Sequence, residues 1–416
     1  MSTAAPARPG SRGPTRGKSG RRRRRWVRRT VAVLGVLALV LGLAFFVGGG
    51  WHFSGLIYSD GLEVKQSPPD YEHEVVAVGD GSLTLTDPPG ADSILDGDDV
   101  WGVRWTRGTG PQTQVGFGQV SGEGTGDDDV TRSFEVLTGE PPQVGDLVDL
   151  EGYAFPDDPE VAVGGPVQDV RYAGPEGELP AWYVPGDRST WVVLVHGKGA
   201  ERTEMLRMMR SSVEAGFPSL AIGYRNDPGA PQDASGMYQF GTTEWRDLQA
   251  AVTHARDNGA ADVVLVGASM GGGIVASYLE QVPDAPVAGV VLDSPMLDFG
   301  ETVSYGAAQE ELPVFGHVPA PLTWSAKRIA SLRYGVDWED LDYLDDTSWL
   351  RVPALVVHGS GDLRVPVSTS EQLSGARPEL VELVVVPEAV HVASWNADPQ
   401  AYAAELTDFL DSLGRD

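Results

Sequence analysis

The chain of 416 residues contains no cysteine and only seven histidines. Without cysteine there can be no disulfide, no thiol nucleophile and no cysteine-ligated zinc site. Histidine is the side chain most often used as a general base near neutral pH, so few positions can serve that purpose. A search for chemistry in this chain is therefore a search among serines, carboxylates and a few histidines.

Basic residues are scarce after residue 30. Residues 1–30 hold 11 Lys and Arg and no acid, which leaves 20 basic against 59 acidic residues in the rest of the chain, a net charge of −39. Phosphate groups would be repelled by so acidic a surface. No nucleic-acid partner is expected, and the acidity instead favours an exposed, soluble domain.

An uncharged apolar run covers residues 31–47. Its length is close to the roughly 20 residues that a membrane-spanning helix needs, and Trp26 and Trp51 flank it as interface residues do. The arginines before the run should stay in the cytoplasm. We therefore expect residues 1–30 to be a basic disordered arm and residues 31–50 to be the anchor of a single-pass cell-membrane protein whose remaining residues are extracytoplasmic.

Two alternatives stay open for this N-terminal segment. A cleaved signal peptide usually has an apolar core of about 7–15 residues. The run here is longer and no Ala-x-Ala site closes it, so an uncleaved anchor is favoured. The arginine pairs before Trp26 could also be read by a twin-arginine export system, which would change the export route but not the final side of the membrane.

Residues 60–165 have the pattern of a small β domain. Segments 74–78 and 82–86 flank Gly79-Asp80-Gly81, which is a tight hairpin signal. Further short apolar runs follow at residues 100–105, 115–120, 130–137 and 147–153. Such evenly spaced strands predict a small sandwich or barrel, whose role the sequence does not indicate. The aspartates in its turns lack calcium-loop spacing, and neither a metal site nor an organic cofactor is predicted.

From residue 167 to residue 416 strands alternate with helices. The predicted strands cover residues 167–172, 179–184, 191–195, 218–222, 263–266, 287–292, 354–357 and 381–386. This alternation, with nearly continuous apolar strands, predicts an α/β fold in which helices cover both faces of a mostly parallel, doubly wound sheet. Residues 296–350 interrupt the alternation and are predicted to form a lid over the carboxyl ends of the strands.

The most informative motif is Gly267-Ala268-Ser269-Met270-Gly271. Four apolar residues predict a buried strand immediately before it, and Ile274, Ala276 and Leu279 begin a helical face after it. Glycines allow a turn so sharp that bulkier residues would collide with the strand and the helix. A serine at the tip of such a turn is exposed above the sheet edge, as a nucleophile must be.

A serine hydroxyl is a weak nucleophile until a base takes its proton. His391 follows the last predicted strand, whereas His196 and His358 each end a strand in a His-Gly pair and are better explained as turn residues. The carboxylate that orients the base is Asp362, after the preceding strand, with Asp293 as the alternative acid. The chain order Ser, Asp, His is that of a serine hydrolase on a doubly wound sheet.

Taken together, these motifs make residues 167–416 resemble the α/β-hydrolase family. The resemblance is to the membrane-anchored and serine-aminopeptidase-like (S33-type) branches, which carry His-Gly after the third strand and a Gly-x-Ser-Met-Gly-Gly turn. It implies that Ser269 is the nucleophile, Asp362 the acid and His391 the base. It further implies an oxyanion hole from the backbone N–H groups of Met270 and Lys198.

Lys198 departs from the aromatic residue or glycine that usually follows His-Gly in this family. A lysine side chain at this position could change which acyl groups the site accepts, but the backbone N–H of the residue can still donate to the oxyanion. Two further segments, 224–229 and 244–247, resemble recurrent parts of the branch and are interpreted as a charge network that braces a loop against a helix, with a pocket wall as the alternative.

The sequence therefore predicts a membrane-anchored serine hydrolase that cleaves an ester, thioester or amide through an acyl-enzyme without a cofactor. Its partners would be a small-molecule, acyl or peptide substrate and, through residues 31–50, the membrane. An esterase is favoured over a peptidase of the same fold. The alternative of another class is a catalytically silent scaffold that binds partners. The oligomeric state is not indicated.

Overall fold

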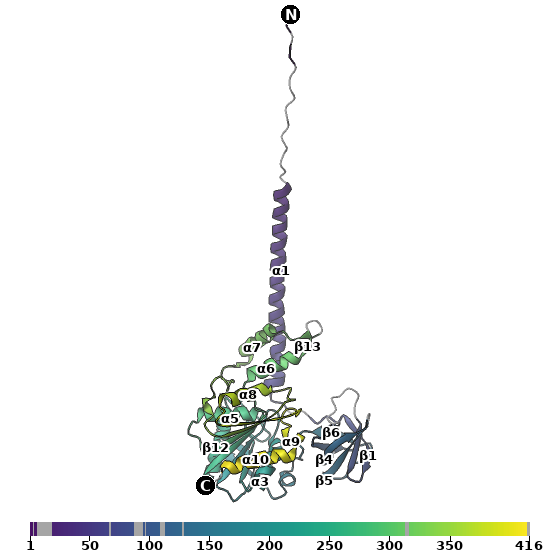
Figure 1. Ribbon diagram of the computed structural model, residues 1–416, viewed down its shortest axis with the longest axis vertical. Coiled ribbons are helices and arrows are strands. Elements are labelled where there is room, and N and C mark those ends of the chain that lie inside the picture. Colours follow the sequence, from purple (N-terminus) through teal and green to yellow (C-terminus); the bar gives the residue numbers. More distant parts are fainter. Residues whose placement is uncertain are drawn as a thin grey trace.

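A computed structural model describes residues 1–2, 4–5, 19–65, 68–86, 95, 97–108, 113–126, 129–312 and 316–413. A long helix, a β-barrel and an α/β domain with a helical insertion follow one another along the chain (Figure 1). We use "the insertion" for residues 296–350.

The N-terminal helix α1 (Ser19–Leu56) continues into a π-helix, η1 (Ile57–Leu62), and most of its length projects away from the rest of the protein (Figure 1). By length and composition it can cross a membrane, with a mean hydropathy of 2.8 in its most apolar window. A signal sequence has the same properties, so anchoring stays a prediction. The disordered arm was predicted too long, because residues 19–30 are helical; residues 3 and 6–18 lie outside the described residues.

The β domain is a closed barrel of antiparallel strands in the order β1-β2-β5-β4-β3-β6. The strands are β1 (His73–Gly79), β2 (Ser82–Thr86), β3 (Trp101–Thr106), β4 (Gln114–Thr125), β5 (Asp129–Gly139) and β6 (Leu147–Glu151). Gly79 pairs with Ser82, which confirms the predicted hairpin. Alternate residues such as Val103 and Trp105 are buried inside, as expected where every second side chain faces the interior. The barrel form of the prediction is therefore correct.

An eight-stranded sheet forms the centre of the α/β domain, in the order β16-β15-β12-β11-β9-β10-β8-β7. Its strands are β7 (Gln168–Ala173), β8 (Glu178–Val184), β9 (Thr190–Val195), β10 (Ser219–Ile222), β11 (Asp262–Ala268), β12 (Val287–Asp293), β15 (Ala354–Gly359) and β16 (Val381–Val386). The strands from β10 to β16 along this order pair in parallel, and β8 pairs antiparallel with both of its neighbours. The mostly parallel sheet predicted from the sequence is confirmed.

Helices cover both faces of this sheet, which explains why its strands are apolar throughout. Val192 and Leu194 of β9 pack on the side of α3 (Leu206–Glu214) and α10 (Pro399–Leu413). Val193 and Val195 pack on the opposite side, with α4 (Trp245–Asp257) and α5 (Met270–Gln281). Because successive side chains of a strand point to opposite faces, each strand contributes to two cores.

The insertion lies against the end of the N-terminal helix (Figure 1). Its main helices are α6 (Phe299–Gln309) and α7 (Ala320–Tyr334). Ser325 of α7 donates a hydrogen bond to the Phe46 carbonyl (2.8 Å), and Arg333 Nη1 donates to the carbonyl of Trp51 (2.9 Å). These contacts attach the insertion to the segment where the apolar run ends.

Candidate active site

Ser269 lies between β11, which ends at Ala268, and α5, which begins at Met270. Its backbone has φ 50° and ψ −118°, a sparsely populated conformation that costs a non-glycine residue about 1–3 kcal/mol. A Cβ on Gly267 would lie 2.7 Å from the Gly271 carbonyl oxygen, and one on Gly271 would lie 2.2 Å from the Val195 oxygen. Glycine at both positions is therefore what allows the turn to present the serine.

Three side chains predicted to form the site lie in one hydrogen-bonded chain. Ser269 Oγ donates to His391 Nε2 (2.9 Å), and His391 Nδ1–H donates to Asp362 Oδ2 (2.7 Å), in the tautomer that carries its proton on Nδ1. Asp362 follows β15 and His391 follows β16. Parallel strands end at one edge of a sheet, so loops that are distant in sequence meet there. The arrangement can transfer a proton from the serine to the imidazole.

The carboxylate of Asp362 is buried and fully engaged. Its Oδ1 accepts hydrogen bonds from the backbone N–H groups of Arg364 (2.8 Å) and Val365 (2.9 Å), and its Oδ2 lies 3.3 Å from His358 Nε2. Burial alone would raise the pKa of Asp362, but the hydrogen bonds from His358 and His391 outweigh it and hold that pKa well below its usual range. The group is therefore ionised at neutral pH and can stabilise an imidazolium.

The alternative acid, Asp293, has other partners. At the end of β12 it accepts hydrogen bonds from the hydroxyls of Tyr402 (3.0 Å) and Ser294 (3.3 Å). Burial raises its pKa. Burial thus disfavours the charged form that would stabilise a protonated imidazole, and the structure brings His391 to Asp362 instead.

The predicted oxyanion donors come from two different segments of the chain. Met270 is the first residue of α5, and Lys198 follows the end of β9. A Cβ on Gly197 would lie 3.0 Å from Ser269 Cβ, so this loop runs directly beside the serine. The ammonium of Lys198 turns away and donates to the carbonyl of Asp60 in η1. Burial and then the charge of Arg364 lower its pKa.

His196 forms a second histidine–aspartate pair, as close as the first. It is fully buried, and its Nε2 lies 2.8 Å from Asp227 Oδ2 while its Nδ1 donates to the Gly197 carbonyl (2.9 Å). Burial alone would lower the pKa of His196, but the charge and hydrogen bond of Asp227, together with the hydrogen bond to Gly197, outweigh it and raise that pKa. The ring also stacks on Tyr224 with centroids 4.3 Å apart. Both ring nitrogens of His196 therefore contact groups other than Ser269, as expected for a residue that stabilises a turn.

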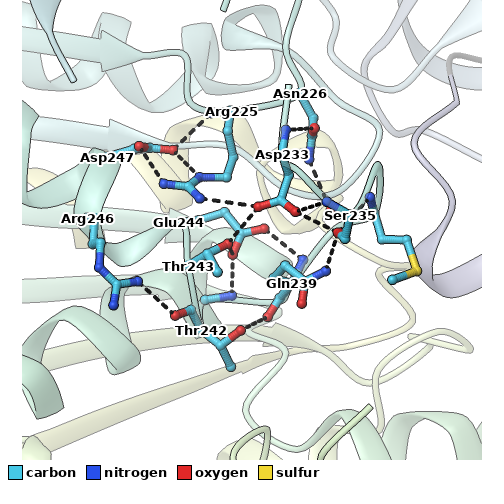
Figure 2. Close-up of polar contacts among 12 residues, drawn as sticks. Arg225, Asn226, Asp233, Ser235, Gln239, Thr242, Thr243, Glu244, Arg246 and Asp247 are labelled. Atoms are coloured by element: carbon cyan, nitrogen blue, oxygen red, sulfur yellow. Dashed lines mark hydrogen bonds and ion pairs between the residues drawn. The ribbon is translucent and has the colours of Figure 1, made fainter. Parts of the chain in front are cut away.

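A charge network joins the loop after β10 to the start of α4 (Figure 2). Arg225 donates to both carboxylate oxygens of Asp247, at 2.7 and 3.0 Å, and to Asp233 at 3.2 Å. Glu244 accepts from the backbone N–H groups of Gln239 (2.8 Å) and Gly241 (3.0 Å). These polar groups use their hydrogen-bonding capacity among themselves, which agrees with a bracing network, while Trp245 and Arg246 of the same segment also line a pocket.

The sequence did not reveal that α6 of the insertion contacts the loop that carries Asp362. The Tyr305 hydroxyl donates to the Asp362 carbonyl (3.1 Å), and Gln309 Nε2 donates to the Leu363 carbonyl (2.9 Å). The two donors are four residues apart and share one face of the helix. That spacing indicates two polar side chains on one helix face, but it does not identify the loop that they contact, which lies more than 50 positions away in the sequence.

Comparison with known proteins agrees with this topology. Residues 186–332 match a family described as serine aminopeptidase, S33. The uncharacterized protein YqkD of Bacillus subtilis is 22% identical over 232 residues, which are 55% of this chain and 73% of YqkD. YfhR of Escherichia coli is 21% identical over 281 residues, which are 63% of this chain and 87% of YfhR.

Two solved structures of similar proteins are an esterase and a phospholipase. Esterase Pf2001 of Pyrococcus furiosus has a TM-score of 0.49 and 20% identity, over 66% of this chain and 98% of the esterase. A bacterial membrane phospholipase A has a TM-score of 0.43 and 21% identity, over 62% of this chain and 89% of that chain. Residues 186–332 are thus similar to the serine-aminopeptidase, S33, family, and the sheet has the strand order of an α/β-hydrolase fold.

Proposed function

We propose that this chain is a membrane-anchored serine hydrolase that cleaves a carboxylic ester, thioester or amide through an acyl-enzyme. The observation that carries the proposal is the continuous hydrogen-bonded chain from Ser269 Oγ through His391 to Asp362. The ionised state of Asp362 supports it, because a negative carboxylate holds the imidazole in the tautomer that can accept a proton at Nε2.

The proposed reaction has two halves. In the first, Ser269 Oγ attacks the substrate carbonyl while His391 Nε2 takes the hydroxyl proton, and the backbone N–H groups of Met270 and Lys198 stabilise the oxyanion. The intermediate collapses to an acyl-serine, and the leaving group departs with the proton from His391. In the second half, water gives a proton to His391 and attacks the acyl carbon; His391 then returns the proton to Ser269 Oγ as the acyl–oxygen bond breaks, which releases the carboxylic acid and the free serine.

The anchor proposal is supported by the exposed apolar side chains along residues 31–47 and by the arginines before them. On this proposal the N-terminus is cytoplasmic and the catalytic domain is extracytoplasmic. Protease added to intact cells should then cleave the protein beyond residue 60, and detergent should be needed to extract it. Recovery of the protein in the medium without detergent would contradict the anchor.

The ester reading is tested by comparing substrates. Wild-type protein and Ser269→Ala are assayed with p-nitrophenyl butyrate and with aminoacyl p-nitroanilides. We expect ester hydrolysis that Ser269→Ala abolishes. An aminopeptidase is the second candidate, since the matched family is described in those terms. Faster cleavage of the anilides than of the ester would favour the aminopeptidase. Loss of both activities in Ser269→Ala would support Ser269 as the nucleophile in either case.

A further inference from the structure

A cavity of about 350 Å³ lies between the N-terminal helix and the insertion. Phe53, Leu56 and Ile57 line one side of it, and Val303 of α6 and Ala326 of α7 line the other. Its size falls within the roughly 300–1,000 Å³ of ligand pockets, and its lining is mainly apolar, as in sites that hold hydrocarbon. The cavity is also lined by Asp60 and Glu310, whose carboxylates would repel an anion, so a carboxylate or phosphate group is a poor candidate for its interior.

The cavity lies close to the expected membrane surface. The uncharged apolar run of α1 ends at Val47, and α7 contacts α1 at Phe46, just inside that end, and at Trp51, just beyond it. Trp324 and Leu332 of α7 are exposed, at 64% and 87%. Exposed tryptophan and leucine beside a membrane span are typical of a surface that touches lipid. A hydrocarbon chain could therefore reach the cavity without crossing water.

The cavity also adjoins the candidate active site. Asp60 lies in its wall, and the carbonyl of Asp60 accepts the Lys198 ammonium beside the predicted oxyanion donor. One face of α6 lines the cavity with Thr302 and Val303, and the adjoining face binds the Asp362 loop through Tyr305. The walls of the cavity are thus built from the same elements that contact the two catalytic loops.

We infer that this cavity holds an acyl chain of a membrane lipid ester while the ester carbonyl is at Ser269. This inference rests on the proposed function and adds the substrate class to it. An apolar chain removed from lipid loses no hydrophobic stabilisation in such a cavity, and the anchor keeps the cavity at the membrane. The helix α1 then serves both as an anchor and as one wall of the substrate site.

Gly306 offers a way to fill the cavity without disturbing the fold. It lies in α6 and lines the cavity, and a Cβ at this position would meet no neighbouring atom within 4 Å. Gly306→Leu should therefore occupy the space meant for the acyl chain. Gly375→Leu is the matched control, because Gly375 also lies in a helix, α8 (Val367–Ala376), with no atom within 4 Å of its Cβ position.

The first test measures chain-length preference with the full chain in vesicles of diether phosphatidylcholine, whose own chains cannot be hydrolysed. Gly306→Leu should lower kcat/KM for p-nitrophenyl dodecanoate by about tenfold or more and leave p-nitrophenyl butyrate nearly unchanged, since lost methylene contacts cost roughly 10–200-fold. Gly375→Leu should change neither rate. An unaltered ratio of the two rates in Gly306→Leu would overturn the inference.

A lipid as the source of the chain is tested with diacyl phosphatidylcholine vesicles. Wild type and Gly375→Leu should release fatty acid, and Gly306→Leu should release about tenfold less. Hydrolysis of p-nitrophenyl dodecanoate without any release of fatty acid from these vesicles would overturn the lipid assignment.

The last test needs no catalysis, so it separates this inference from the proposed function. Ser269→Ala in diether vesicles is irradiated with a palmitic acid that carries a diazirine at its terminal carbon, and the cross-linked peptides are mapped. Labelling should fall on α6 and α7 and disappear when Gly306→Leu is added. Labels confined to residues 31–47 would contradict an acyl site. Labelled α6 in Ser269→Ala, together with a wild type that hydrolyses no ester, would instead contradict the serine hydrolase.

Discussion

Two of the histidine–aspartate pairs at the edge of the sheet, His391 with Asp362 and His196 with Asp227, differ in what the other imidazole nitrogen faces; a third histidine, His358, shares the carboxylate of Asp362. The Nδ1 of His391 lies 2.7 Å from Asp362 and its Nε2 accepts from the Ser269 hydroxyl. The Nε2 of His196 lies 2.8 Å from Asp227, and its Nδ1 donates to a backbone carbonyl. The first pair can pass a proton to or from a substrate, whereas the second ends in the backbone.

Exposure separates the pairs as well. The side chain of His391 is 17% exposed, and that of His196 is fully buried. A buried, saturated pair holds a loop in place, because breaking it leaves an uncompensated polar group. A pair becomes a candidate for catalysis when it is open on one side and aimed at a nucleophile. On the proposed function, a histidine next to an aspartate does not by itself mark an active site.

The largest expected effect is on the pair at Ser269. Asp362→Asn should lower kcat by about 10⁴, because the amide favours the wrong imidazole tautomer. Asparagine keeps the size of the side chain and an Oδ1 that can accept from the N–H groups of Arg364 and Val365, so the melting temperature should stay within a few degrees of the wild type. Steady-state kinetics with p-nitrophenyl butyrate and a thermal melt measure both quantities. Full activity in this variant would place the acid elsewhere.

The buried pair should respond in the opposite way. Asp227→Asn removes the charge that faces His196 and should lower the free energy of unfolding by about 3 kcal/mol, the scale for breaking a buried ion pair. The rate per folded molecule should change far less than in Asp362→Asn. Urea unfolding of the detergent-solubilised protein gives the first quantity, and activity normalised to labelled active sites gives the second. If Asp227→Asn lost turnover while keeping normal stability, the pair of His196 and Asp227 would also have a catalytic role, and the distinction between the two pairs would be wrong.

Asp293→Asn tests whether Asp293, instead of Asp362, is the partner of His391, and its expected effect on turnover is smaller. Burial already raises the pKa of Asp293, and asparagine resembles its neutral form in shape. We expect kcat to fall by less than about tenfold and the Tyr402 contact to be kept in a weakened form. A collapse of turnover here, with Asp362→Asn active, would move the acid to Asp293 and leave the roles of Ser269 and His391 standing.

The smallest expected effect is on stability at low pH. The pKa of Asp362 is lower in the folded protein than in the unfolded chain, so the unfolded state binds more protons as the pH falls. The stability that this carboxylate contributes is present above the ordinary aspartate pKa of about 4 and is lost as the pH falls through the depressed folded value. The difference in melting temperature between wild type and Asp362→Asn should therefore be constant from pH 7 to 5 and shift below pH 4.

The sequence predicted the parts that depend on local patterns. The turn at Ser269 could be predicted because its glycines stand in a local strand-turn-helix pattern, and the hairpin at Gly79 because its turn residues are adjacent in sequence. The contact of Gly271 with Val195 of β9 adds a constraint that the pattern alone does not reveal. The loops that carry Asp362 and His391 follow from the parallel sheet, since its strands end at one edge. Predicted strands and observed strands therefore agree closely from residue 167 onward.

Contacts between distant elements could not be predicted in this way. Nothing in the sequence around Ser325 or Arg333 indicates that α7 packs on α1, because these pairs are separated by about 280 positions. The helical start of the arginine run at Ser19 was also missed, since composition indicates solubility and does not exclude a helix extended from an apolar one. His196 was correctly assigned to a turn, but its partner Asp227 was not foreseen.

The measurement that most directly tests the account is labelling with a fluorophosphonate followed by peptide mapping. The reagent reacts with a serine only when a neighbouring base activates it. We predict a label on Ser269 in the wild type, none in Ser269→Ala, strong loss in His391→Ala and retained labelling in Asp227→Asn protein that is folded. Folded wild-type protein that takes no label would contradict the account and favour a silent α/β-hydrolase scaffold.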